Sequence, residues 1–103
     1  MKEQIIRIEQ EIIRKNDFDI NSFIEDCKEN FLQTKDELVK YEYLPKSENK
    51  NETIILYVKT KQILPMVPSY QIVLGGLQMV NTKYENYFKV YNINPSMIDL
   101  SEE

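Results

Sequence analysis

The chain has 103 residues, of which 42% are hydrophobic and 29% are charged, and its formal net charge is −4. This length suits one domain, residues 1–103, and no apolar run approaches the roughly 18 residues needed to span a bilayer. We therefore expect no membrane partner and a cytoplasmic location. Basic residues are interleaved with acidic ones, so the sequence disfavours nucleic acid as a partner.

Histidine and cysteine, which carry much of the nucleophilic, acid–base and metal chemistry of proteins, are scarce. The chain has no histidine and one cysteine, Cys27. A nucleophilic cysteine usually depends on a histidine, so Cys27 is interpreted as a small apolar residue on a helix face. No HExxH or CxxC motif singles out a set of ligands or carboxylates. We expect a protein that is not an enzyme and that has no cofactor and no metal.

The first predicted element is an amphipathic helix over residues 2–15. Ile5, Ile8 and Ile12 recur at helical spacing, with charged residues around the rest of the turn. The pair Asn16-Asp17 then offers turn chemistry.

A seven-residue repeat follows, with alternating steps of four and three. Ser22 and Glu25 have the spacing of a capping box, and Pro45 ends the segment. The unbroken repeat favours one helix over residues 22–43, although VKYEY, residues 39–43, alternates like a strand. Residues 45–52 are a polar surface loop. The repeat consists of Ile20, Ile24, Cys27, Phe31, Thr34, Leu38 and Tyr41.

Residues 53–60, TIILYVKT, are β-branched and aromatic, and they predict a strand, with a buried helix as the alternative. A lone strand leaves its backbone polar groups unpaired. It therefore needs a partner, either residues 61–67 in a hairpin or another chain.

Both glycines of the chain lie side by side in IVLGGLQMV, residues 72–80. An apolar repeat runs through them undisturbed from Tyr70 to Tyr91, which predicts a helix over residues 69–92. Two interior glycines weaken a helix, so Gly76 is interpreted as a close-packing position where another backbone approaches. The alternative is a Gly-Gly turn that closes a hairpin. Residues 95–103 form a short acidic tail.

The predicted fold class is α+β and helix-dominated, with three amphipathic helices and one short β-strand or hairpin. The alternative has two helices followed by an antiparallel β-meander with the Gly-Gly hairpin.

Four tyrosines on the third predicted helix form the candidate interaction surface: Tyr70, Tyr84, Tyr87 and Tyr91. Tyrosine suits an interface with one apolar and one wet side, although core residues with hydroxyls at the rim would give the same pattern. With the two long repeats and the unpaired strand, these tyrosines predict a non-catalytic protein–protein interaction module. It would be a small acidic adaptor or inhibitor that forms a homo-oligomer, docks on a larger protein, or both.

The composition, rich in Ile, Lys, Asn and Tyr, fits a phage or mobile element of a low-GC bacterium. The alternative function is a small-ligand-binding domain with an apolar pocket between sheet and helices. That pocket would be lined by Tyr57, Met66, Met79 and Tyr84.

Overall fold

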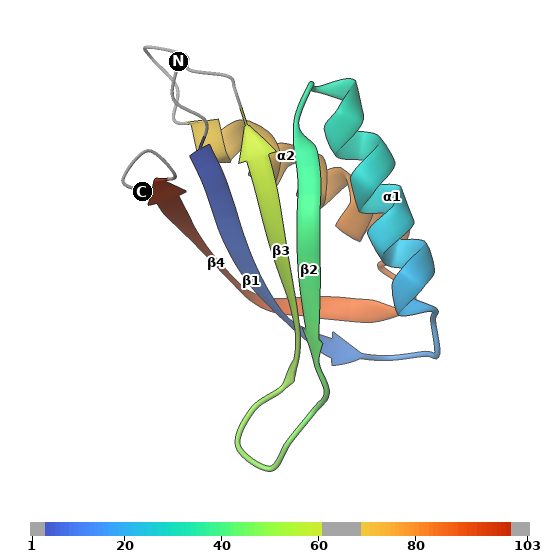
Figure 1. Ribbon diagram of the computed structural model, residues 1–103. Coiled ribbons are helices and arrows are strands. Elements are labelled where there is room, and N and C mark those ends of the chain that lie inside the picture. Colours follow the sequence, from blue (N-terminus) through green and yellow to red (C-terminus); the bar gives the residue numbers. More distant parts are fainter. Residues whose placement is uncertain (1–3, 61–68, 100–103) are drawn as a thin grey trace.

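The computed structural model describes residues 4–60 and 69–99, which form four strands and two helices (Figure 1). In chain order these elements are β1 (Gln4–Arg14), α1 (Ile20–Gln33), β2 (Glu37–Leu44), β3 (Glu52–Thr60), α2 (Ser69–Lys83) and β4 (Phe88–Asp99).

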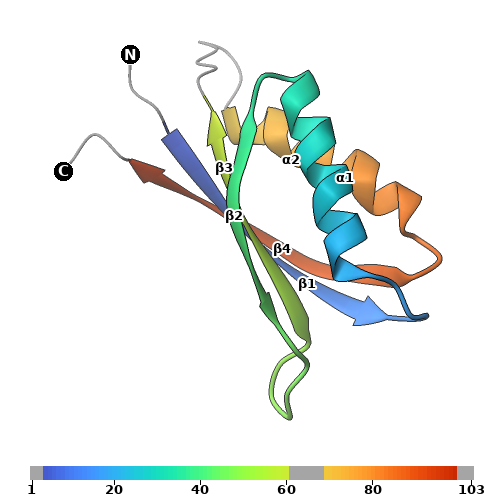
Figure 2. The same cartoon turned by 45° about the vertical axis from the view of Figure 1, so that its right-hand side comes forward.

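The four strands form one antiparallel sheet in the order β2-β3-β1-β4, and both helices lie on one face of it (Figures 1 and 2). Ile8 of β1 pairs with Leu56 of β3 on one side and with Pro95 of β4 on the other. The β-α-β-β-α-β chain order with β1 and β3 in the centre is the ferredoxin-like arrangement. β2 and β4 are therefore the two edge strands.

The hydrophobic core lies between the sheet and the two helices. Alternate residues of a strand point to the same face, so β1 and β3 each present every second side chain to the helices. The two helices pack apolar residues, which recur at helical spacing, against these strand side chains. The fully buried core side chains include Ile6, Ile8 and Ile12 of β1, Phe23, Cys27 and Phe31 of α1, Ile54, Leu56 and Val58 of β3, and Leu77 of α2.

Each edge strand contains a β-bulge. In β2 the register with β3 shifts between Leu38 and Lys40, which leaves Val39 as the extra residue. In β4 the register with β1 shifts so that Asn92 pairs with Glu11 but Val90 pairs with Ile12, which leaves Tyr91 extra. A bulge bends the strand and increases its local twist.

The prediction of a helix-dominated fold with three helices is wrong, because strands predominate in the described residues. Residues 2–15, predicted as a helix, contain β1. Ile6, Ile8, Gln10 and Ile12 of β1 pair with the helix-facing residues of β3. Because Gln10 is polar, it interrupts the apolar alternation expected of a strand. The remaining isoleucines, Ile5, Ile8 and Ile12, then match helical spacing.

The predicted helix over residues 22–43 is helical only in its first part. α1 starts after Asp19, whose carboxylate accepts a hydrogen bond from the backbone N–H of Asn21 at 3.1 Å, so the predicted cap lay too late. The helix ends at Gln33, and the chain turns at Lys35, which has a φ of 66°. The strand alternative for residues 39–43 is right, because these residues lie in β2.

Residues 53–60 form a strand as predicted, but this strand is not short of a partner. β3 lies between β1 and β2 and pairs with both. It therefore needs neither another chain nor a hairpin with residues 61–67, which lie outside the described residues. The unpaired strand therefore no longer argues for self-association.

The helix predicted over residues 69–92 ends at Lys83. Both glycines lie inside α2 and neither has a positive φ, so the Gly-Gly hairpin and the meander built on it are wrong. After a turn, β4 begins at Phe88 and continues through Pro95. Proline is tolerated there because β4 is an edge strand. Residues 95–99, predicted as tail, belong to β4, and residues 100–103 lie outside the described part.

Candidate functional site

A groove of about 590 Å³ lies between α2 and β4. Its floor is apolar and is formed by Leu74, Phe88, Val90, Ile93 and Pro95. Its rim is polar and is formed by Lys15, Gln78, Asn81, Thr82, Glu85 and Lys89. Ligand sites in proteins commonly have this composition and a volume of roughly 300–1,000 Å³.

The register of the sheet places the floor of the groove. Val90, Ile93 and Pro95 pair with helix-facing residues of β1, so their side chains point to the helix side of β4. α2 packs mainly against α1 and makes few contacts with β4. The inner side of the edge strand is consequently left partly uncovered, and Figure 2 shows β4 curving beneath α2.

Two contacts hold α2 in this position. Gln10 of β1 and Asn81 of α2 join their side-chain amides in two hydrogen bonds, at 3.0 and 2.8 Å. On the other side of α2, Gly76 lies against α1. A Cβ atom at this position would be 2.6 Å from Oδ1 of Asn30 and 3.6 Å from the ring of Phe31. The missing side chain thus lets the two helices approach closely.

The charges of the groove gather at one end. Lys15 and Lys89 lie near the start of β4, where the backbone N–H of Lys15 donates to the carbonyl of Tyr87 at 2.7 Å. The ammonium of Lys15 donates to the backbone carbonyl of Glu85 at 3.0 Å. The Glu85 side chain belongs to the same rim, whereas Lys89 pairs with Ile13, so its side chain points to the open face of the sheet. The other end, at Leu74 and Pro95, is apolar.

The groove contains binding chemistry without an evident reactive group. The hydroxyl of Thr82 donates to the backbone carbonyl of Gln78 at 2.9 Å. Among residues 4–60 and 69–99, no three His, Cys, Asp or Glu side chains are grouped to hold a metal ion. Cys27 is fully buried elsewhere, and burial, followed by the nearby charge of Asp26, raises the pKa of its thiol.

At the C-terminal end of β1, the half-buried guanidinium of Arg14 forms an ion pair with the buried carboxylate of Glu52. Arg14 donates to both carboxylate oxygens of Glu52, at 3.1 and 2.5 Å, and the Tyr43 hydroxyl donates to the same carboxylate. The hydrogen bonds from Arg14 hold the pKa of Glu52 below its usual value, and the Tyr43 bond acts in the same direction. The Arg14 guanidinium also lies over the Phe18 ring, 4.4 Å from its centroid. All three polar groups are occupied by one another.

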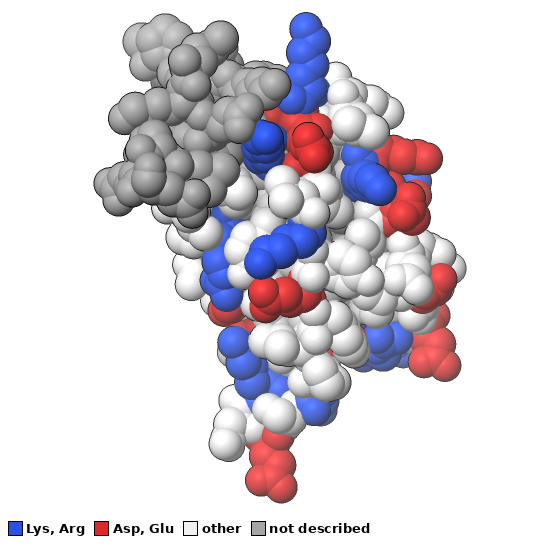
Figure 3. Space-filling model, in the orientation of Figure 1, with Lys and Arg blue, Asp and Glu red and all other residues white. Residues whose placement is uncertain are grey.

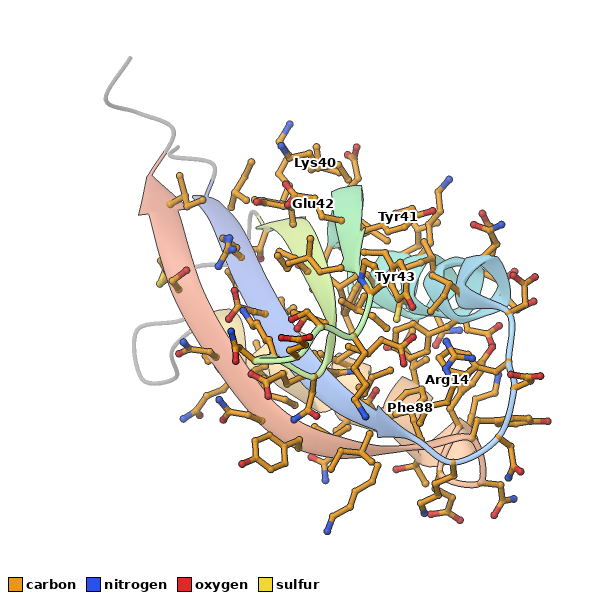
Figure 4. The ribbon with its side chains drawn as sticks, turned by 90° about the horizontal axis from the view of Figure 1, so that it is seen from below. Arg14, Lys40, Tyr41, Glu42, Tyr43 and Phe88 are labelled. Carbon is orange, nitrogen blue, oxygen red and sulfur yellow. The ribbon has the colours of Figure 1, made fainter. Side chains whose placement is uncertain are left out.

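Figure 4 shows the two sides of β2. Tyr41 and Tyr43 point to the side that faces α1, and Lys40 and Glu42 point to the opposite, open face of the sheet. Alternation along the strand explains this division. The Tyr41 hydroxyl donates to the side chain of Asn21 in α1 at 3.2 Å.

The open face of the sheet carries charges that compensate one another. Glu9 contacts both Arg7, at 3.3 Å, and Lys50, at 3.5 Å. The Tyr57 hydroxyl accepts from Arg7 and donates to Glu42, and the Lys40 ammonium lies over its ring. Figure 3 shows basic and acidic side chains interspersed on this face. Such a surface lacks the continuous positive potential that phosphate backbones require.

The candidate tyrosines whose side chains are described, Tyr84, Tyr87 and Tyr91, do not form one surface. Tyr84 is buried in an aromatic cluster with Phe18, Phe23 and Phe88, and its hydroxyl donates to Asp26 at 2.7 Å. Burial, with that hydrogen bond as the second cause, raises the pKa of this hydroxyl.

The other three candidate tyrosines are separated along the chain. Tyr87 is half-exposed in the turn after α2 and packs beside Phe18. Tyr91 is 62% exposed at the bulge of β4. Tyr70 lies in the first turn of α2, and its side chain is outside the described part. The predicted repeat that linked them ends with the helix at Lys83.

The predicted pocket residues are also separated. Tyr57 lies on the open face of the sheet, Tyr84 is in the aromatic cluster, and Met79 is 65% exposed on α2. Met66 falls outside the described residues. The floor residues of the real groove were not predicted. Leu74 lies outside the apolar repeat that runs from Tyr70 to Tyr91, and the alternation of Phe88 and Val90 is the sequence signal for the strand.

No known family model and no curated protein matches the chain. A solved structure named "Structural Genomics, protein YJCS" is similar to it with a TM-score of 0.45 and 10% sequence identity, covering 89% of this chain and 96% of that one. No helix in the described part of the chain is long and apolar enough to cross a membrane.

Proposed function

We propose that the chain is a non-catalytic binding protein for a small ligand and that the ligand lies in the groove between α2 and β4. The observation that carries this proposal is the apolar floor of the groove beneath a polar rim. Apolar lining supplies affinity by removing ligand surface from water, and a few polar groups fix the ligand's orientation. The groove also lies next to an edge strand, where a ligand can enter from solvent.

The non-catalytic part of the proposal is supported by the state of the reactive side chains. The thiol of Cys27 is buried and its pKa is raised, which disfavours the nucleophilic thiolate. The buried carboxylate of Glu52 is saturated by Arg14 and Tyr43. We further propose a cytoplasmic location, because a free buried cysteine is typical of reducing compartments.

Binding of an apolar fluorescent dye of the anilinonaphthalene class tests the proposal. We expect saturable binding to one site, with a rise in fluorescence, in the native protein. Gln78→Trp places a large side chain on the rim of the groove and should abolish binding. Gln71→Trp, at an exposed position in the first part of the same helix, is the control. Equal dye binding by both variants would show that the groove is not the site.

A second variant pair tests the floor. Ile93 and Ile98 both lie in β4, but the first lines the groove while the second pairs with Ile5 on the open face. Ile93→Asp should weaken dye binding strongly, and Ile98→Asp should leave it unchanged. Circular dichroism and thermal melting of both variants show whether each one folds.

The second candidate function is the protein–protein interaction module, an acidic adaptor or inhibitor that binds a larger protein or a second copy of itself. The observation in its favour is a set of largely exposed apolar side chains, which include Leu32, Met79 and Tyr91. Sedimentation over a wide range of protein concentration tests the self-association. For a candidate target enzyme, a steep weakening of binding with salt would support the acidic inhibitor.

A further inference from the structure

The open face of the sheet carries charges in two rows that run across the strands. Each row joins paired positions of β2, β3 and β1, and the two rows are about 7 Å apart along the strands. One row has a glutamate on each side of a β3 residue, and the next row has a basic residue on each side. The acidic row consists of Glu42, Ile55 and Glu9, and the basic row consists of Lys40, Tyr57 and Arg7.

We propose that a second copy of this chain packs on the open face, with the acidic row of each copy opposite the basic row of the other. A two-fold axis parallel to the rows and midway between them places Glu42 opposite Lys40 of the second copy. The same rotation places Glu9 opposite Arg7. A two-fold axis parallel to the strands would instead place Glu42 opposite Glu9 and so oppose like charges. A two-fold dimer needs a self-complementary patch, and the order of the charges supplies one.

The proposed arrangement agrees with the way in which sheets pack. The rotation lays each strand over its own counterpart in the opposite direction. Two packed sheets keep their strand directions within about 30° of each other and lie about 10 Å apart. Both helices cover the other face of the sheet, so neither helix obstructs the second copy (Figures 1 and 2).

The charged groups keep hydrogen-bonding capacity for a second copy. The Arg7 guanidinium donates to Tyr57 and to Glu9, both at 3.3 Å, and has further N–H donors. The Lys40 ammonium lies over the ring of Tyr57 and forms no ion pair within the described residues. Oε1 of Glu42 accepts from Tyr57 at 3.2 Å, and no described residue donates to its Oε2. Contacts inside one copy therefore do not exhaust these groups.

Exposed apolar side chains lie around the two rows on the same face. Ile98, Leu44 and Ile13 are 39%, 41% and 42% exposed, and the register directs all three to the open face. Between Lys89 and Asp99, β4 carries no charged residue. The centre of a protein interface is typically depleted of charge. We therefore expect the apolar side chains to supply affinity and the charge rows to fix the orientation.

A uniformly charged partner fits this face less well than a second copy does. Such a partner would be attracted by one row and repelled by the other, and opposed like charges weaken an interface. The alternation of sign matches only a surface that alternates in the same way. The inference gives a surface to the self-association named above, and it is independent of the groove, which lies on the helix side of the sheet.

Sedimentation velocity and light scattering test the dimer with the native protein. We expect a species of twice the chain mass of 12.3 kDa, whose dissociation increases with salt. An acidic variant combines Arg7→Glu with Lys40→Glu, and a basic variant combines Glu9→Lys with Glu42→Lys. Each variant opposes like charges in its own homodimer, so each should dissociate at least about tenfold more readily than the native protein.

Mixing the two variants is the decisive step. An acidic face and a basic face are complementary at both rows, so the equimolar mixture should restore a dimer that contains one copy of each. The control combines Glu25→Lys with Glu29→Lys at exposed positions of α1, which changes the charge as much as the basic variant does. The control should dimerise like the native protein and should not restore dimers of the acidic variant.

Circular dichroism and thermal melting show whether each variant folds. If a double variant does not fold, Lys40→Glu and Glu42→Lys repeat the comparison singly, because both positions are exposed on an edge strand. A native protein that stays monomeric up to about 1 mM would overturn the inference. A dimer that survives both charge reversals would show that copies meet through another surface. Neither result bears on dye binding in the groove, so the proposed function and this inference can fail separately.

Discussion

The side-chain amides of Gln10 and Asn81 bind each other through two hydrogen bonds and so join the middle of β1 to α2. Gln10 is fully buried in the core, whereas Asn81 is half-buried and reaches the rim of the groove. The pairing gives the buried amide of Gln10 the hydrogen-bond partners that it would otherwise lack beneath the helix. It also fixes α2, which forms one wall of the groove.

Removing Asn81 should therefore be more damaging than removing Gln10. Asn81→Leu leaves the buried amide of Gln10 without partners, which costs about 1–3 kcal/mol of unfolding free energy. Gln10→Met keeps the volume and leaves Asn81 beside the groove, where water can solvate it, so the loss should be smaller. In the double variant the losses should be less than additive. Urea unfolding measures all three, and strictly additive losses would contradict the coupling.

The two glycines of α2 should respond in opposite ways to substitution. A Cβ at Gly75 meets nothing within 4 Å, so Gly75→Ala should stabilise the protein by about 0.5–1 kcal/mol through helix propensity. Gly76→Leu places a side chain against Asn30 and Phe31 of α1 and should destabilise it by about 1–3 kcal/mol. Gly76→Ala should gain less than Gly75→Ala, because the Asn30 side chain must move. Thermal melts give the comparison, and destabilisation by Gly75→Ala would contradict it.

The ion pair of Glu52 and Arg14 should contribute to stability only when Glu52 is ionised. The folded-state pKa of Glu52 lies below its usual value, chiefly because of the hydrogen bonds from Arg14. This contribution is therefore complete above the unfolded-state pKa and is lost as pH falls through the folded-state pKa.

Glu52→Gln should accordingly destabilise the protein by about 1–3 kcal/mol at neutral pH. The difference from the wild type should shrink as the pH is lowered below the unfolded-state pKa of Glu52. Chemical unfolding at a series of pH values measures the difference. A gap that stays constant down to strongly acidic pH would count against the ion pair. Glu48→Gln, in the exposed loop between β2 and β3, is the control and should have little effect.

The thiol of Cys27 should be inert in the native protein. It is fully buried, and burial raises its pKa, so little thiolate is present or accessible. Its reaction with an aromatic disulfide reagent should be slow and should accelerate in urea as the protein unfolds. Rapid native-state labelling would reopen the possibility of a nucleophilic role.

Local periodicity predicted the helices, whose residues make local hydrogen bonds and bury one face. The first part of the seven-residue repeat, from Ile20 to Phe31, lies in α1. The segment around Gly75 and Gly76 lies in α2. The strand over residues 53–60 was found because its β-branched and aromatic run is buried on both faces.

β2 was recognised only as the alternative for residues 39–43, and β1 and β4 were missed for reasons that lie outside their local sequence. In β1 the buried Gln10 is acceptable only because Asn81, 71 residues later, pairs with it. In β4 the bulge at Tyr91 shifts the alternation, and Pro95 is compatible with a strand only at a sheet edge. The seven-residue phase that continued through Leu38 and Tyr91 was coincidental. The groove depends on the position of β4 and was therefore not predictable without the sheet order.

The bulges at Val39 and Tyr91 also bear on how the protein behaves at high concentration. An edge strand with a regular row of free N–H and C=O groups is a template on which further chains can add and grow into fibrils. Here one edge is interrupted at Val39, and the other is interrupted at Tyr91 and again at Pro95, which has no N–H to donate. These interruptions leave neither edge with a long, straight ladder that a second sheet could extend, and they therefore disfavour cross-β growth.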